Sequence, residues 1–254
     1  MRIIPVIVIV SLLIATSLVW NFQGQSVSKN NADVPVVSPL HKPDPAQYEK
    51  LKKQLAEKRT LLARQYQSAR TSSKKADVLK QARNTLESYL LKMTHCWRGT
   101  PWDFNGTCKT PGSGKIACGY FISTVLQDAG VKCERIRLAQ QPSQRIIASF
   151  LTRKDMHIRA GLSYDDFLKQ EIARGPGWRI VGLDRHVGFL VVEPGGKTRF
   201  IHSNPGTPQV VLDEAREESA YLRNSNYRVT GNISANHEFL KGWLTGKTWK
   251  TKTQ

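Results

Sequence analysis

The pattern of apolar and polar positions predicts two amphipathic helices in the first half of the chain. Between about residues 45 and 70, apolar side chains recur at spacings of four and seven, at Leu51, Leu55, Leu62 and Tyr66. The polar segment "TSSKK" interrupts this pattern. A second helix is predicted over about 75–94, where one face carries Leu79, Ala82, Leu86, Tyr89 and Leu90.

The second half of the chain predicts two short helices and a set of strands. One helix spans 118–129 and ends at Gly130, and the other spans 163–174, with Ser163 as its N-cap. Four β-rich segments follow, at 178–183, 186–192, 198–202 and 227–233, and the turn "EPGGK" joins the second and third into a hairpin. A helix followed by a sheet indicates an α+β fold.

The N-terminus carries an uncharged apolar stretch from Ile3 to Trp20, preceded by a single charge at Arg2. Its length is near the lower limit for crossing a bilayer and exceeds that of an ordinary secretory signal. Residues 1–22 are therefore expected to be a signal anchor or signal peptide, and the polar residues 23–44 a linker. The rest of the chain should lie outside the cytoplasm, in the periplasm or at the cell surface, so nucleic acid is not an expected partner.

The chain is strongly basic, with 38 Lys and Arg against 20 Asp and Glu and a formal charge of +18. Between Glu49 and Lys92, basic residues outnumber acidic ones twelve to four. This basic helical segment, 45–95, is interpreted either as a solvated helix face or as a stalk that lies on an anionic membrane or cell wall. The remaining residues, 96–254, are long enough for one well-cored domain.

The four cysteines allow two interpretations. An even number in an exported chain favours disulfides, and Cys96 and Cys108 flank a loop that a disulfide between them would close. Cys118 differs, because it begins a predicted helix directly after a loop rich in Gly and Ser. Unpaired amides and the helix dipole at that position should lower the pKa of its thiol, and the amides can hold an oxyanion. Cys118 is therefore a candidate nucleophile.

A nucleophilic cysteine needs a base and a group that orients the base, and the predicted hairpin supplies both. If Leu190 pairs with Phe200, three side chains gather at one end of the hairpin: His186, His202 and Asn204. Zinc ligation by the cysteine and the two histidines is the competing interpretation. No CxxC, HxxxH or HxH pair preorganises such a site, so no metal or other cofactor is expected.

Four segments of the chain resemble the NlpC-type cell-wall cysteine peptidases, a branch of the papain-like superfamily. They read "GTPW" (99–102), "GSGKIACGYF" (112–121), "HVGFL" (186–190) and "FIHS" (200–203), and the resemblance covers about residues 97–205. It implies a papain-like fold in which a nucleophile helix packs on an antiparallel sheet. It also implies that Cys118 attacks an amide of a peptidoglycan stem peptide, that His186 is its general base and that His202 orients His186.

The candidates for substrate binding or support are Trp102, Tyr120 and Asn204. Trp102 stands in place of the family's tyrosine, and the cysteine is flanked by Ala117 and Gly119 where the family has aspartate and serine. Two alternatives stay open, the first because of these differences and the second because of the basic charge and the possible pairing of Cys118 in a disulfide. One is a papain-like amidase or acyltransferase with another substrate, and the other is a non-catalytic wall- or membrane-binding module with structural disulfides. The sequence predicts no oligomeric state.

Overall fold

The computed structural model describes residues 41–253. The predicted anchor, residues 1–22, lies outside this range, as do residues 23–40 of the predicted linker. Within the described range, no helix combines the length and the apolar composition needed to cross a membrane.

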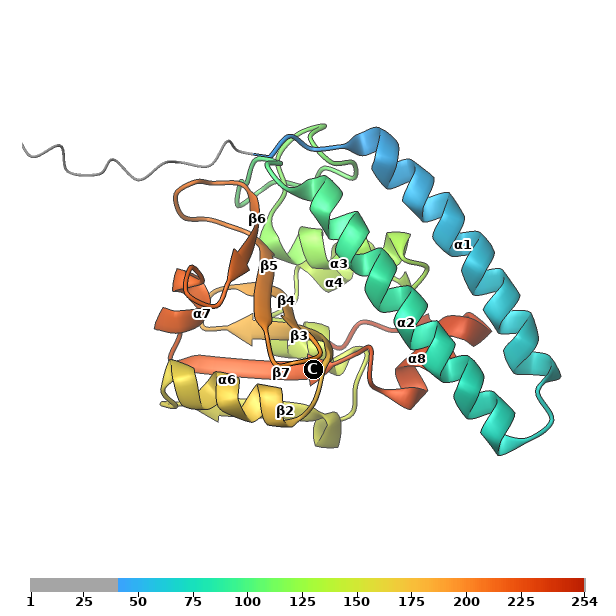
Figure 1. Ribbon diagram of the computed structural model, residues 1–254. Helices are drawn as coiled ribbons and strands as arrows, with labels where there is room; N and C mark the ends of the chain where they lie inside the picture. The colour runs from blue at the N-terminus through green and yellow to red at the C-terminus, as the bar shows by residue number, and fades with distance from the viewer. Residues whose placement is uncertain (1–40, 254) are drawn as a thin grey trace, which may run out of the picture. The chain divides into compact units, whose positions relative to one another are not determined.

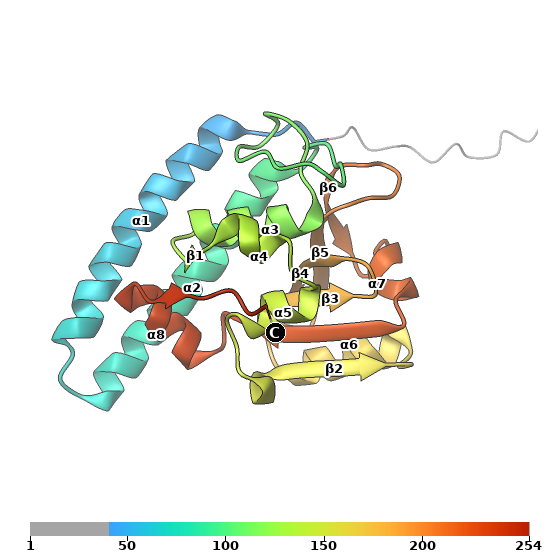
Figure 2. The same ribbon diagram turned by 180° about the vertical axis from the view of Figure 1, so that it is seen from behind.

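The first two helices form where the apolar spacing predicts them. Helix α1 spans Pro45–Ser68, and the side chain of Asp44 caps its start by accepting a hydrogen bond from the amide of Gln47. Helix α2 spans Ser72–Trp97, is capped by Thr71 and is longer at both ends than the predicted 75–94. The two helices run side by side in opposite directions (Figures 1 and 2).

Both helices pack into the same body as the rest of the described chain, which forms one compact unit. The Tyr48 ring of α1 meets the Trp97 ring edge-on, with 5.6 Å between centroids. Its hydroxyl donates to Asp128 at the end of α3 (Cys118–Asp128), at 2.9 Å. Arg59 donates to the carbonyl of Trp243 in α8 (His237–Thr245), at 2.7 Å. The basic helical segment is therefore an integral part of the fold and not a separate stalk.

A six-stranded antiparallel sheet lies at the centre of the body, in the order β2-β7-β3-β4-β5-β6. The strands are β2 (Met156–Ala160), β3 (Gly177–Leu183), β4 (Val187–Val192), β5 (Thr198–Ser203), β6 (Val211–Ala215) and β7 (Tyr227–Asn232). The four predicted strands correspond to β3, β4, β5 and β7, and the two edge strands were not predicted. A short parallel pair, β1 (Lys132–Cys133) and β8 (Thr248–Trp249), lies apart from this sheet.

Helices cover both faces of the sheet, as Figures 1 and 2 show from opposite sides. One face carries α3, α4 (Arg135–Ala139) and α5 (Ser143–Ala148), and the other carries α6 (Tyr164–Ala173) and α7 (Ala220–Asn224). Successive strand residues point to opposite faces. Phe189 and Val191 therefore belong to the core beneath α3, whereas Leu190 and Phe200 pack in the core with Phe167 of α6. The fold is α+β, as predicted.

We predict that Leu55→Ala destabilises the whole protein, because this leucine of α1 is 1% exposed in the main core. A buried Leu→Ala substitution costs about 2–5 kcal/mol of unfolding free energy. The matched control is Leu61→Ala on the same helix, where the side chain is 57% exposed, and its effect should stay within about 0.5 kcal/mol. Urea unfolding of the full chain measures both. Equal stability of the two variants would contradict the integral packing of α1.

Candidate active site

The loop before α3 places Cys118 beside the end of β5. The amide of Ile116 donates to the carbonyl of Pro101 at 2.9 Å, which ties this loop to the "GTPW" segment. The hydroxyl of Ser203, the last residue of β5, donates to the carbonyl of Ile116 at 2.7 Å. The start of α3 is thereby held against β5, in which His202 directly precedes Ser203.

The first turn of α3 presents free backbone amides. Ala117 is the N-cap, no side chain caps the helix, and the first helical hydrogen bond runs from Phe121 to Ala117 at 2.9 Å. The amides of residues 118–120 therefore have no partner within the helix and can hold an oxyanion. A Cβ at Gly119 would lie 2.2 Å from the carbonyl oxygen of Ala139. Only glycine after the cysteine lets α3 approach α4 this closely.

The expected lowering of the pKa of Cys118 is wrong. Burial is the largest influence and raises the pKa of this thiol above its ordinary value, while nearby backbone amides of Val187, Gly119 and Cys118 itself oppose the rise. The helix start supplies the predicted favourable amides, but they do not offset the loss of solvent around the sulfur. Cys118 is therefore a neutral thiol at pH 7 in the free protein.

Two histidines and a glutamate form a hydrogen-bonded chain at one end of the hairpin. Leu190 pairs with Phe200, which confirms the predicted register. Nε2 of His186 lies 2.7 Å from Nδ1 of His202, and Nε2 of His202 lies 2.9 Å from Oε2 of Glu214. The glutamate comes from β6, whose strand was not predicted, and no motif in the sequence marks it.

Burial sets the protonation of this chain. It holds the pKa of His186 well below its ordinary value, with a smaller contribution from His202, and it lowers the pKa of His202 to about 3. Burial also raises the pKa of Glu214 to about 7, and the charges of Glu218 and Asp213 add to that rise. Both histidines are therefore neutral at pH 7, while Glu214 changes charge near that pH.

Cys118 and His186 line the same cleft, a hollow of about 220 Å³ between the start of α3, the α4–α5 loop and the β3–β4 turn. Within the described residues, no hydrogen bond joins the thiol to the imidazole. A second cleft of about 260 Å³ lies across the same turn, where Tyr221 of α7 joins His186. The rings of His186 and Tyr221 are 5.3 Å apart. The two clefts share His186 and three residues at the β3–β4 turn, Leu183, Asp184 and Arg185.

The three candidate support residues lie in different surroundings. Trp102 contributes backbone pairing to Ile116, and its buried indole nitrogen has no hydrogen-bond partner among the described residues. The ring of Tyr120 lies under the guanidinium of Arg135, 5.0 Å away. The side chain of Asn204 donates to the carbonyl of Pro208 and accepts from an amide within the same turn. None of the three lines the cleft that holds Cys118.

All four cysteines lie in the described part of the chain and are free thiols, so the expected disulfide between Cys96 and Cys108 is not formed. The Cys96 thiol is buried on α2 and donates to the carbonyl of Lys92 at 3.3 Å. Cys108 belongs to the loop beside Gly114. The loop that a disulfide was expected to close is instead held by backbone bonds, such as that from Cys108 to Lys115 at 3.1 Å.

Among residues 41–253, no group of three or more His, Cys, Asp or Glu is arranged to hold a metal ion. For Cys118, His186 and His202, the hydrogen bonds of His202 explain why the three do not form a zinc site. His202 uses Nδ1 toward His186 and Nε2 toward Glu214, so neither ring nitrogen is left for a metal.

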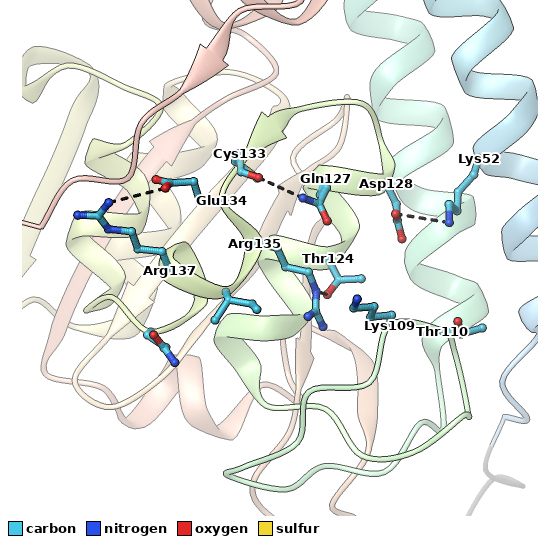
Figure 3. Close-up of a pocket in the computed structure, with 12 residues that line it drawn as sticks. Lys52, Lys109, Thr110, Thr124, Gln127, Asp128, Cys133, Glu134, Arg135 and Arg137 are labelled. Atoms are coloured by element: carbon cyan, nitrogen blue, oxygen red, sulfur yellow. Dashed lines mark hydrogen bonds and ion pairs between the residues drawn. The ribbon is translucent and has the colours of Figure 1, made fainter.

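A larger cavity of about 600 Å³ opens at the opposite end of α3 (Figure 3). Arg135 lies at its wall, where its side chain donates to the hydroxyl of Thr124 and to the carbonyls of Thr107 and Cys108. The carboxylate of Asp128 forms an ion pair with Lys52 and accepts a hydrogen bond from the Tyr48 hydroxyl. This cavity contains neither Cys118 nor a histidine. Its central polar groups brace α4 against α3 and thereby support one wall of the cysteine cleft.

No family model, curated protein or solved structure matches this chain.

We predict that all four thiols react with Ellman's reagent in the denatured, unreduced protein, because all four are free in the structure. The count is made against the same protein treated with reductant. Two reactive thiols without reductant, and four with it, would show that one disulfide forms.

Proposed function

We propose that the protein is a cysteine hydrolase in which Cys118 is the nucleophile, His186 the general base and His202 the residue that orients His186. One observation carries the proposal. His186 lines the same cleft as Cys118, and its Nε2 is held by His202 at 2.7 Å, so its Nδ1 is the nitrogen left to exchange protons. The four free cysteines also support it, because a nucleophile must not be tied in a disulfide.

The proposed reaction begins from a neutral thiol and a neutral imidazole. Nδ1 of His186 takes the proton of Cys118 as the sulfur attacks the carbonyl carbon of an amide. The resulting oxyanion is stabilised by the free amides at the start of α3. Because the pKa of the thiol is raised by burial, the proton transfer accompanies the attack and does not precede substrate binding.

Breakdown of the tetrahedral intermediate uses the same proton. The imidazolium of His186 donates it to the leaving amine, the C–N bond breaks and a thioacyl enzyme remains. His186 then takes a proton from water, whose oxygen attacks the thioester carbonyl. The second tetrahedral intermediate releases the carboxylic acid, and the proton returns to the sulfur of Cys118. Each turnover consumes one water and one amide.

The substrate of the proposed enzyme is a peptide of bacterial peptidoglycan, cleaved outside the cytoplasm. This part is supported by the four segments that resemble NlpC-type peptidases and by the apolar N-terminal stretch. The papain-like fold is proposed on the same resemblance, together with the packing of α3 on an antiparallel sheet. The net charge of +18 favours residence on an anionic wall or membrane.

We predict that the full chain releases peptides from purified peptidoglycan and that Cys118→Ala abolishes the release. The matched control is Cys133→Ala, which removes another partly buried thiol that does not line the cleft and should retain activity. Mass spectrometry of the products identifies the cleaved bond. Equal product from the wild type and Cys118→Ala would overturn the proposal. A product in which the acyl group is joined to an acceptor other than water would indicate a transferase.

A further inference from the structure

The sequence pattern identifies two histidines of the proposed site, but the structure adds a third member behind them. Glu214 lies opposite Phe200 in the pairing of β5 and β6, beside the position of His202. Its carboxylate is mostly buried and lies 2.9 Å from Nε2 of His202. The three side chains therefore form one line of hydrogen bonds, from Glu214 through His202 to His186.

The direction of the protons along this line determines what His186 can do. A neutral imidazole carries one N–H donor and one acceptor nitrogen. When Glu214 is ionised it can only accept, so His202 must carry its proton on Nε2 and accept at Nδ1. His186 must then carry its proton on Nε2 and donate to His202. Nδ1 of His186 is left with a free electron pair, as a base for the thiol requires.

Protonation of Glu214 exchanges donor and acceptor in both hydrogen bonds of the line. The carboxylic acid then donates to Nε2 of His202, which carries its own proton on Nδ1 and donates to Nε2 of His186. The proton of His186 is now on Nδ1, and this nitrogen cannot accept the proton of Cys118. The change adds one proton to the cluster and leaves both imidazoles neutral.

We propose that Glu214 is a positioning residue for the Cys118–His186 pair: its carboxylate sets the tautomers of both histidines and so keeps Nδ1 of His186 free to accept a proton. The inference rests on the proposed function and concerns the regulation of the same site. Glu214 acts through His202 and does not touch the reacting atoms.

The pH range of this effect follows from the surroundings of Glu214. The groups that face it are His202 on β5, Asp213 on its own strand and Glu218 in the segment after β6. Asp213 itself forms an ion pair with Arg199 and a hydrogen bond with Nε2 of His95. Burial and the two carboxylates raise the pKa of Glu214 to about 7, so the active arrangement is present above this pH and is lost as the pH falls through it. Charging of His202 interferes only near pH 3.

The decisive measurement is the tautomer of each histidine, followed by ¹⁵N NMR of the full chain between pH 5.5 and 8.5. We expect His186 and His202 to carry their protons on Nε2 at pH 8.5 and on Nδ1 at pH 5.5, with a midpoint near 7. Glu214→Gln removes the ionisable group, so its tautomer populations should not change over this range. Tautomers that do not change with pH in the wild type would overturn the inference.

Glu218→Gln provides a variant that keeps every member of the line. Among residues 41–253, its side chain accepts a hydrogen bond only from the exposed amide of Ala215, and glutamine can preserve that bond. Removing its charge should lower the pKa of Glu214 and move the midpoint to lower pH, with unchanged tautomers at pH 8.5. The inference fails if the midpoint of the tautomer change is the same in Glu218→Gln as in the wild type and the change is still seen in Glu214→Gln. Another group would then control the histidine tautomers.

Activity supplies an independent reading. On the acid side of the pH profile, the rate of peptidoglycan cleavage should fall to half at the pH of the NMR midpoint. In Glu218→Gln this acid limb should shift together with the midpoint. In Glu214→Gln the limb near pH 7 should disappear, and the maximal rate should fall by about 10- to 100-fold, the range found when the outer partner of a metal-bound histidine is removed. The tautomer measurement needs no substrate. A tautomer change without peptidoglycan cleavage would therefore refute the proposed substrate and leave the role of Glu214 standing, whereas cleavage with an unmoved limb would refute that role alone.

Discussion

The hydrogen bond between Nε2 of His186 and Nδ1 of His202 is the interaction on which the candidate site depends. It leaves Nδ1 as the one ring nitrogen of His186 that can exchange a proton with a substrate or with the thiol. The bond forms because the β4–β5 register brings the ends of the two strands together. Gly188 makes room for it, since a Cβ there would lie 2.4 Å from the Phe200 ring and 3.0 Å from Cβ of His202. The glycine of the "HVG" segment is therefore a packing requirement of the histidine pair.

Burial is the second constraint, because it favours the uncharged forms of the Cys118 thiol and of both imidazoles. The thiol of Cys118 has a raised pKa and the two imidazoles have lowered pKa values, so a resting thiolate–imidazolium pair is disfavoured. The carboxylate of Glu214 is then the one charge of the line that changes near neutral pH. With the role proposed for Glu214, the site would respond to pH through a residue that acts through His202 and does not touch the sulfur.

The N-terminal helices connect the basic surface to this site. Leu51 and Leu55 of α1 are in the main core, while most of the Lys and Arg of α1 and α2 remain at the surface. Helix α2 packs on α3, and His95 near its end contacts Asp213, the neighbour of Glu214 on β6. One segment therefore buries part of the core, presents positive charge and braces the strand that holds Glu214.

The sequence by itself determined the elements whose periodicity is strong and local. The leucine spacing of α1 and α2, the capping serine of α6 and the β-rich segments of the hairpin each reflect contacts within a few residues. The hairpin register was an assumption that the short turn favoured, and the pairing of Leu190 with Phe200 agrees with it. The tertiary structure decided what depends on distant segments. Burial overrode the helix dipole at Cys118, the thiols of Cys96 and Cys108 stayed free, and the edge strand β6 delivered Glu214 to His202. These outcomes depend on solvent exclusion and strand order, which arise only when residues far apart in the chain pack together.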